Sequence, residues 1–172
     1  MGYTTEFEGK ITFNKPISPE LKEYINKFSY TRRMKRDNEK IKEVFPNWEE
    51  LCYNGTLGEE GEYFIGGLGF CGQDKDDSII DYNYPPHTQA GLWCKWIIND
   101  DGELVWNGAE KFYGYVEWLR YLINNFLAPN GYIANGRINY QGEEPWDGGY
   151  IKVVNNKVTK TPTKLNRKYI FN

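Results

Sequence analysis

Histidine and cysteine are scarce in this sequence, which has one histidine, three cysteines and no apolar run longer than a few residues. Cys52, Cys71 and Cys94 form no CxxC pair, and an odd number of dispersed cysteines argues against a disulfide framework and against a zinc site. The short apolar runs argue against a membrane-spanning helix, and MGYTTEFEGK lacks the apolar core of a signal peptide. We therefore expect a cytoplasmic protein with no membrane partner, no cofactor and no metal.

Apolar and aromatic residues are abundant by contrast. Of the 172 residues, 40% are hydrophobic and 17% are aromatic, which excludes a disordered chain. A chain of this length buries roughly 70% of the surface that it exposes when unfolded, so it needs no cross-links to fold. We expect one α+β domain over residues 1–160, followed by a basic tail over residues 161–172.

The spacing of apolar residues indicates one sheet and two main helices. Alternation predicts a half-buried strand over residues 3–13, and helical spacing predicts helices over 19–29 and 110–127. Further strands are expected over 91–98, 103–106 and 132–142, and in a last hairpin across Asn155 and Asn156. An antiparallel sheet with both helices on one face would bury both apolar stripes, and the order also matches a split βαβ, ferredoxin-like core.

Residues 30–90 interrupt this order as a glycine-rich, acidic insertion. Short strands are expected in it at EYFIGG, GLGF and SIIDYN, and a short helix at NEKIKEVF. The insertion contributes to a strong segregation of charge, because residues 44–149 carry five basic and seventeen acidic side chains. Such an acidic body attracts basic surfaces, including the phosphate-binding channels of nucleases. The alternative is a solvated surface that keeps the protein soluble.

The candidate partner-binding residues are carboxylates of the insertion together with loop aromatics. We expect their side chains to project outward and to contact a protein partner: Glu59, Glu60, Glu62, Asp74, Asp76, Asp77, Asp81, Tyr82, Tyr84 and Trp146. Clustered carboxylates can also bind a divalent cation, or act as a general acid and a general base. A small enzyme acting on nucleic acid or a nucleotide is therefore an alternative, and a solvated acidic loop is another.

A basic cluster follows the first expected helix and consists of Arg32, Arg33, Lys35 and Arg36. These side chains could pair with phosphates, or they could bind the chain's own insertion. The acidity of the insertion favours internal pairing. The single histidine, His87, lies in the loop PPHT without a recognisable nucleophile motif, so a nucleophilic site is not expected.

Several longer strings carry a resemblance. The strings are TRRMKRD, GEEGEYFIGGLGFCGQDKDDSIIDYNYPP, GLWCKW and EKFYGYVEWLRYLINNFL. They resemble a family of small hypothetical proteins found on bacterial chromosomes, plasmids and phages. The resemblance covers about residues 2–158 and carries no catalytic residues over. Small acidic proteins of mobile elements include inhibitors of host defence, and in size and charge this chain is similar to anti-CRISPR proteins that act on Cas9. The resemblance implies a protein-binding inhibitor, with a Cas9-type nuclease and its guide RNA as partner. A housekeeping or immunity-type binding protein is the further alternative.

Overall fold

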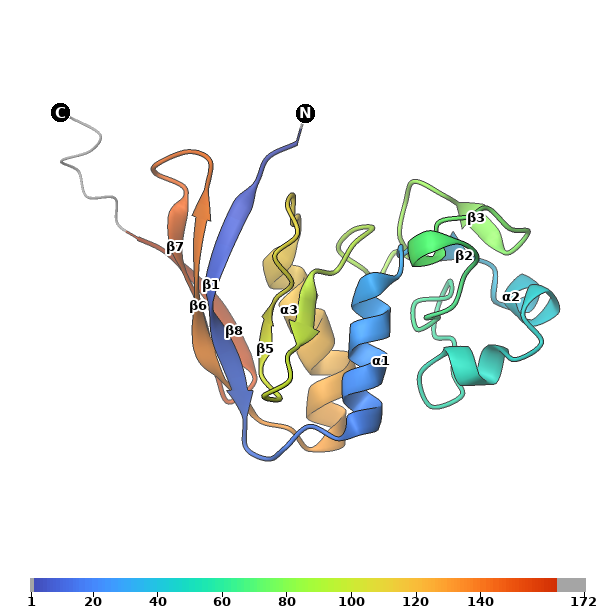
Figure 1. Ribbon diagram of the computed structural model, residues 1–172, viewed down its shortest axis with the longest axis horizontal. Coiled ribbons are helices and arrows are strands. Elements are labelled where there is room, and N and C mark those ends of the chain that lie inside the picture. The colour runs from blue at the N-terminus through green and yellow to red at the C-terminus, as the bar shows by residue number, and fades with distance from the viewer. Residues whose placement is uncertain (1, 164–172) are drawn as a thin grey trace. The chain divides into compact units, whose positions relative to one another are not determined.

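The computed structural model describes residues 2–163 (Figure 1). Their contacts group them into two compact units: unit 1 holds residues 2–19 and 95–163, and unit 2 holds residues 20–94. Within these residues no helix is both long and apolar enough to cross a membrane. Of the expected basic tail, residues 161 and 162 end a strand, and residues 164–172 lie outside the described residues.

Unit 1 contains a six-stranded sheet in which all neighbouring strands are antiparallel, and this sheet confirms the α+β class. The sheet order is β4-β5-β1-β6-β7-β8. As in a split βαβ core, β1 lies between the β4–β5 hairpin and β6, and the last hairpin extends the sheet. The strands are β1 (Thr5–Phe13), β4 (Trp96–Ile98), β5 (Leu104–Trp106), β6 (Ala134–Gly142), β7 (Gly148–Val154) and β8 (Lys157–Pro162).

The pairing of β1 with β6 forms the centre of this sheet. It runs without a register shift from Thr5↔Gly142 to Phe13↔Ala134, and the alternating residues of β1 bury one face. Gly136 has a φ of +156°, and a Cβ there would lie 2.4 Å from the carbonyl oxygen of Lys10. Only glycine therefore permits this close approach of the two strands.

The expected helix at 110–127 is shorter than its apolar pattern. It starts as α3 (Tyr115–Leu122), continues as a π-helical turn, η3 (Ile123–Leu127), and ends in a 3₁₀ turn, η4 (Ala128–Asn130). The preceding residues are not helical because Lys111 and Gly114 have positive φ angles. Arg120 ties α3 to β8 by donating to the carbonyl oxygen of Val158 at 3.1 Å.

Unit 2 holds the insertion together with the first helix. Two of the expected insertion elements are confirmed: the short helix is α2 (Asn38–Val44), and the strand at SIIDYN is β3 (Ile79–Asp81). EYFIGG and GLGF form turns and irregular loop, with one isolated bridge at Leu68. A small apolar core of Ile41, Phe45, Cys52, Leu57 and Phe64 lies beneath these turns. The elements are α1 (Pro19–Tyr30), β2 (Lys35–Arg36), α2 (Asn38–Val44), η1 (Trp48–Leu51), η2 (Phe70–Gly72) and β3 (Ile79–Asp81).

Candidate functional site

Two arginines of the basic cluster point into unit 2. Arg36 donates from Nη1 to Asp76 Oδ2 at 2.9 Å and to Ser78 Oγ at 2.6 Å, with the two charged side chains only 2% and 4% exposed. Arg33 is also buried, and its Nη2 donates to the backbone oxygen of Glu62 at 2.7 Å. The prediction of internal pairing with the insertion is thus confirmed, and the phosphate-binding alternative is wrong for both side chains.

The other two basic side chains also bind the insertion, nearer the surface. Arg32 donates from Nη2 to the backbone oxygen of Tyr82 at 3.0 Å, and its guanidinium lies 4.2 Å from the centroid of the Tyr82 ring. Lys35 Nζ lies 3.4 Å from Glu60 Oε2. All four basic side chains, which lie near the start of the insertion, therefore bind residues further along it.

Glu62 and Asp76 do not project outward as expected. Glu62 is 6% exposed; its Oε2 accepts the backbone N–H of Glu59 at 2.8 Å and its Oε1 accepts the hydroxyl of Thr88 at 3.0 Å. Asp76 Oδ1 accepts both the backbone N–H and the hydroxyl of Ser78, at 2.8 and 2.5 Å. The expectation is wrong here because nearby donors replace water around both carboxylates.

Glu59 and Glu60 instead hold the single histidine. His87 Nδ1 lies 2.5 Å from Glu60 Oε1, and His87 Nε2 lies 3.1 Å from Glu59 Oε2. The backbone N–H and the imidazole of His87, with Lys35, lower the pKa of Glu60 to about 2, and the hydrogen bond to Glu60 raises the pKa of His87. The sequence signal for this arrangement is a single histidine within an acidic insertion. The interpretation of PPHT as a loop without a nucleophile motif did not reveal the contacts of His87 with Glu59 and Glu60.

The remaining expected residues divide between the two units. Asp74, Asp77 and Tyr84 are exposed, whereas Asp81 is half-buried and accepts the backbone N–H of Asn83 at 2.9 Å. Half-buried Tyr82 also lies under Lys75, whose Nζ is 5.6 Å from the ring centroid. Trp146 is 60% exposed, but it belongs to unit 1, in the turn between β6 and β7.

Among the described residues, Phe70 is the most exposed large hydrophobic side chain, at 75%, and it was not among the expected partner-binding residues. It sits at the start of η2, between Gly69 with a φ of +76° and Cys71 with a φ of +56°. A left-handed conformation is costly for a cysteine and is retained only where surrounding contacts impose it. Here the backbone N–H of Arg32 donates to the Cys71 oxygen at 3.0 Å. The sequence signal was a phenylalanine within the glycine-rich string GGLGFCG.

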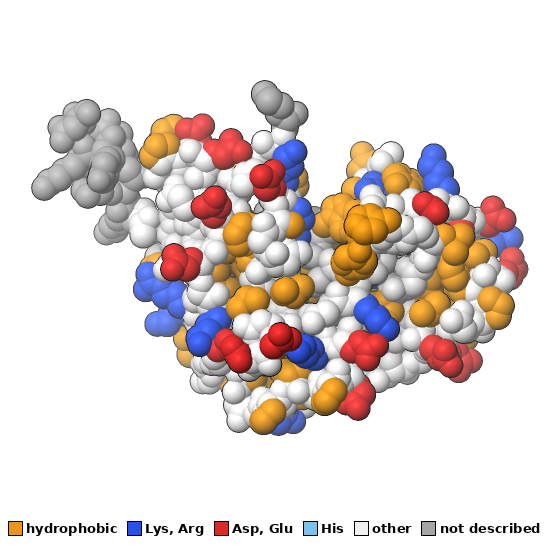
Figure 2. Space-filling model, in the orientation of Figure 1, with side chains coloured by type: hydrophobic (Ala, Val, Ile, Leu, Met, Phe, Trp, Pro, Cys, Tyr) orange, Lys and Arg blue, Asp and Glu red, His pale blue; other side chains and the backbone are white. Residues whose placement is uncertain are grey.

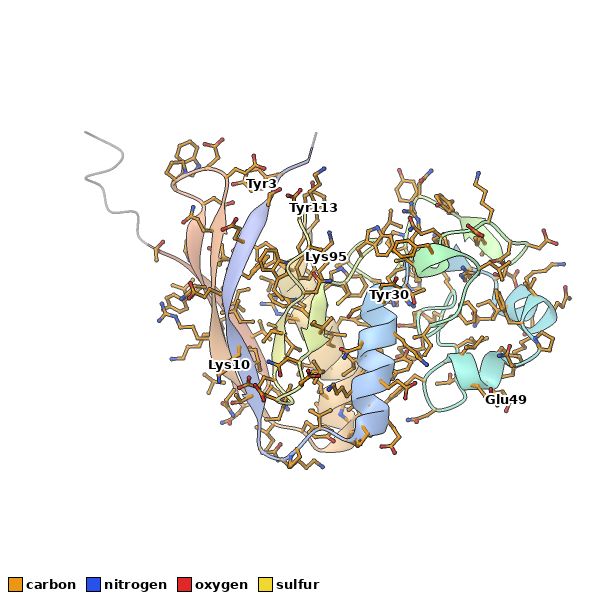
Figure 3. The ribbon with its side chains drawn as sticks, in the orientation of Figure 1. Tyr3, Lys10, Tyr30, Glu49, Lys95 and Tyr113 are labelled. Carbon is orange, nitrogen blue, oxygen red and sulfur yellow. The ribbon has the colours of Figure 1, made fainter. Side chains whose placement is uncertain are left out.

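Other exposed side chains lie beside Phe70. Tyr30, 57% exposed at the C-terminal end of α1 (Figure 3), packs edge-on against Phe70 with ring centroids 5.9 Å apart. Leu68 is 45% exposed and pairs with Asp74 in an isolated bridge, the N–H of Asp74 donating to the Leu68 oxygen at 2.8 Å. We call Tyr30, Leu68, Phe70 and Asp74 the Phe70 surface; Figure 2 shows hydrophobic side chains gathered near that end of α1.

Among residues 2–163 no group of three or more histidine, cysteine or acidic side chains is placed to hold a metal ion. A cleft of about 640 Å³ lies in unit 1, lined in part by Glu6, Glu8 and Arg137, and no residue of the insertion lines it.

Comparisons with models of known protein families, with curated proteins and with solved structures find no match to this chain.

Proposed function

We propose that this protein is a binding inhibitor that engages a protein partner through the Phe70 surface. The observation that supports the proposal is Phe70 itself, an exposed aromatic side chain held at the tip of a turn whose backbone is fixed from both sides. Gln73 Nε2 donates to the Phe70 oxygen at 3.1 Å, and Arg32 fixes the next residue. Exposed apolar groups on an ordered scaffold are typical of binding surfaces, because little conformational entropy is lost when a partner covers them.

The contacts of Tyr30 strengthen this reading. Its ring supports one side of Phe70, and the Cys71 thiol raises the pKa of its hydroxyl. The ring contact therefore joins Tyr30 to η2. Central aromatic side chains of this kind contribute about 2 kcal/mol or more each when a partner buries them.

Charge indicates the chemistry of the partner. Asp74 lies over Gly69, next to Phe70, and Asp77 follows three residues later with its side chain exposed. Arg36 and Arg33 are buried and cannot offset these carboxylates at the surface. The surface therefore suits an apolar pocket with a basic rim, and opposite charges would speed the association.

A Cas9-type nuclease loaded with guide RNA is the first partner to test. Its nucleic-acid channels are strongly basic, which matches the exposed carboxylates of unit 2. A housekeeping or immunity-type binding protein would use the same surface and differ only in its partner. Carboxylate-dependent catalysis has less support, because Glu62 and Asp76 are already bonded within unit 2.

The proposal is tested by measuring association with a Cas9–guide RNA complex by biolayer interferometry. Phe70→Ser should weaken binding about thirtyfold, the equivalent of about 2 kcal/mol. The double change Asp74→Lys with Asp77→Lys should slow association at low salt and have less effect at high salt. Tyr113→Ser is the control, because it removes from unit 1 an aromatic side chain that is 54% exposed and was not a candidate contact.

Unchanged circular dichroism would show that the variants fold. Wild-type affinity in both variants would refute the Phe70 surface as the contact site. Absence of any binding by the wild-type chain would refute the Cas9 partner, and affinity capture from a host lysate, compared between wild type and Phe70→Ser, would then identify a different one.

A further inference from the structure

The imidazole of His87 is held between two carboxylates from another loop of unit 2. Its Nδ1 lies 2.5 Å from Glu60 Oε1 and its Nε2 lies 3.1 Å from Glu59 Oε2. The backbone N–H of His87 also donates to Glu60 Oε1, at 2.9 Å. One histidine thus joins the loop at 57–63 to the loop at 85–89 through three contacts.

This geometry suits only the protonated ring. An imidazolium has two N–H donors, one for each carboxylate, whereas a neutral imidazole has one donor and one lone pair. When the ring loses its proton, one nitrogen lone pair faces a carboxylate oxygen, and that contact becomes repulsive. Deprotonation therefore breaks one of the two side-chain contacts.

The surroundings decide which contact breaks. Glu60 keeps two other partners, the His87 backbone N–H and Lys35 Nζ at 3.4 Å. Glu59 has a side chain that is 67% exposed, and water readily replaces its contact with His87. Glu62 is the remaining charged group near the ring; its carboxylate is bonded to Thr88 and to the Glu59 backbone. Glu59 is therefore the partner that neutral His87 releases.

The second loop carries Tyr84, whose side chain is 66% exposed. The Tyr84 backbone oxygen accepts the N–H of Lys35 at 2.9 Å, and Pro85 and Pro86 connect this point to His87. Side chains of His87, Thr88 and buried Gln89 tie this segment to the glutamate loop, the Gln89 Nε2 donating to the Glu62 backbone oxygen at 2.7 Å. Gln89 therefore fixes the end of the segment in either state of the imidazole, and the position of residues 85–88 depends on His87.

We infer that His87 is a pH-sensitive clasp, which holds residues 85–88 against the glutamate loop while the imidazole is protonated and loosens them when the proton is lost. The direction follows from the raised pKa of His87. The clasp contributes its full stabilisation below the ordinary histidine pKa of about 6.5, and the contribution is lost as the pH rises through the higher value of the folded protein. The inference concerns the free protein and does not depend on the proposed inhibitor function.

The test uses NMR, because the sequence has one histidine and its ring signals need no separation from others. In the full chain the His87 pKa should lie above about 6.5. Glu60→Gln should lower it most, Glu59→Gln should lower it less, and Glu50→Gln, an exposed control in the same unit, should leave it unchanged. A pKa at or below 6.5, or one that Glu60→Gln does not lower, would overturn the clasp.

The second measurement follows the loop itself. The backbone amide signals of Tyr84 and Thr88 should shift with the midpoint of the His87 titration, and their heteronuclear NOE values should fall above it. In His87→Gln this pH-dependent step should be lost, while signals of the sheet in unit 1 stay as in the wild type. Loop amides with the same shifts and NOE values on both sides of the midpoint would show that His87 titrates without controlling the loop, which also overturns the inference.

Discussion

The buried pair of Arg36 and Asp76 offers the sharpest test of how unit 2 holds together. We predict that Asp76→Ala destabilises the protein strongly, because it leaves the Arg36 guanidinium buried without a counter-charge. Arg36 is 2% exposed, and its Nη2 has no hydrogen-bond partner among residues 2–163 even with Asp76 present. Water therefore has little access with which to compensate for the lost carboxylate.

The magnitude follows from the class of the interaction. Removing one partner of a buried ion pair costs about 3–5 kcal/mol, whereas replacing both partners by apolar groups costs far less. Arg36 already lies 5.0 Å from the centroid of the Phe64 ring, so a methionine at position 36 has apolar neighbours. Arg36→Met combined with Asp76→Ala should therefore be more stable than Asp76→Ala alone.

The assay is urea unfolding of the four members of this double-mutant cycle. A second cycle on Lys40 and Glu43 is the control, since that pair is solvent-exposed with a closest N–O distance of 3.3 Å and should contribute less than about 1 kcal/mol. If Asp76→Ala costs no more than the control substitutions, or if the double variant is as unstable as the sum of the single changes, the reasoning fails.

The same pair predicts sensitivity to acid. Burial acts to raise the pKa of Asp76, but hydrogen bonds from Ser78 and the charge of Arg36 outweigh it and hold the pKa below its usual value. This contribution to stability is present above the unfolded pKa of about 3.9 and disappears as the pH falls through the lower folded value. The acid-induced loss of stability should accordingly be smaller in the double variant than in the wild type.

Two further predictions concern the sheet of unit 1. Gly136→Ala should lower the free energy of unfolding more than Gly102→Ala. Both glycines have positive φ, but only at position 136 would a Cβ lie 2.4 Å from the Lys10 carbonyl oxygen. Thermal unfolding measures the two losses, and equal losses would contradict the close approach of the strands. Ile11→Ala should lower the free energy of unfolding by about 2–5 kcal/mol and Val154→Ala by less than about 0.5 kcal/mol, because Ile11 is fully buried and Val154 is 46% exposed. Similar losses for the two variants in urea unfolding would count against this core.

The sheet was predictable because its information is local. Alternation along residues 3–13 and the turn residues at 99–102 and 155–156 specify strands and hairpins through neighbouring residues, and these elements are confirmed. The helix start at Tyr115 was missed because it depends on a left-handed backbone at Gly114, which apolar spacing does not record. The expected strands at EYFIGG and GLGF failed for a related reason, since Gly67 and Gly69 have positive φ angles.

The candidate site depended on contacts between distant parts of the chain. Composition established that the insertion is acidic and that a basic cluster lies near its start, and it favoured pairing between the two. Composition could not tell which of Asp74, Asp76 and Asp77 is buried. Burial depends on which carboxylate contacts Arg36 when β2 and β3 pair. Phe70 likewise became a surface residue through the turn at Cys71, which Arg32 stabilises from 39 positions away in the chain.

Local pattern thus sufficed for the fold class, whereas the orientation of each charged side chain required the folded structure. Secondary-structure propensity and apolar periodicity depend on a few neighbouring residues, so both can be read from a short stretch of sequence. Desolvation acts on groups brought together by folding, and the free energy of burying a charge depends on partners that no short window of sequence contains.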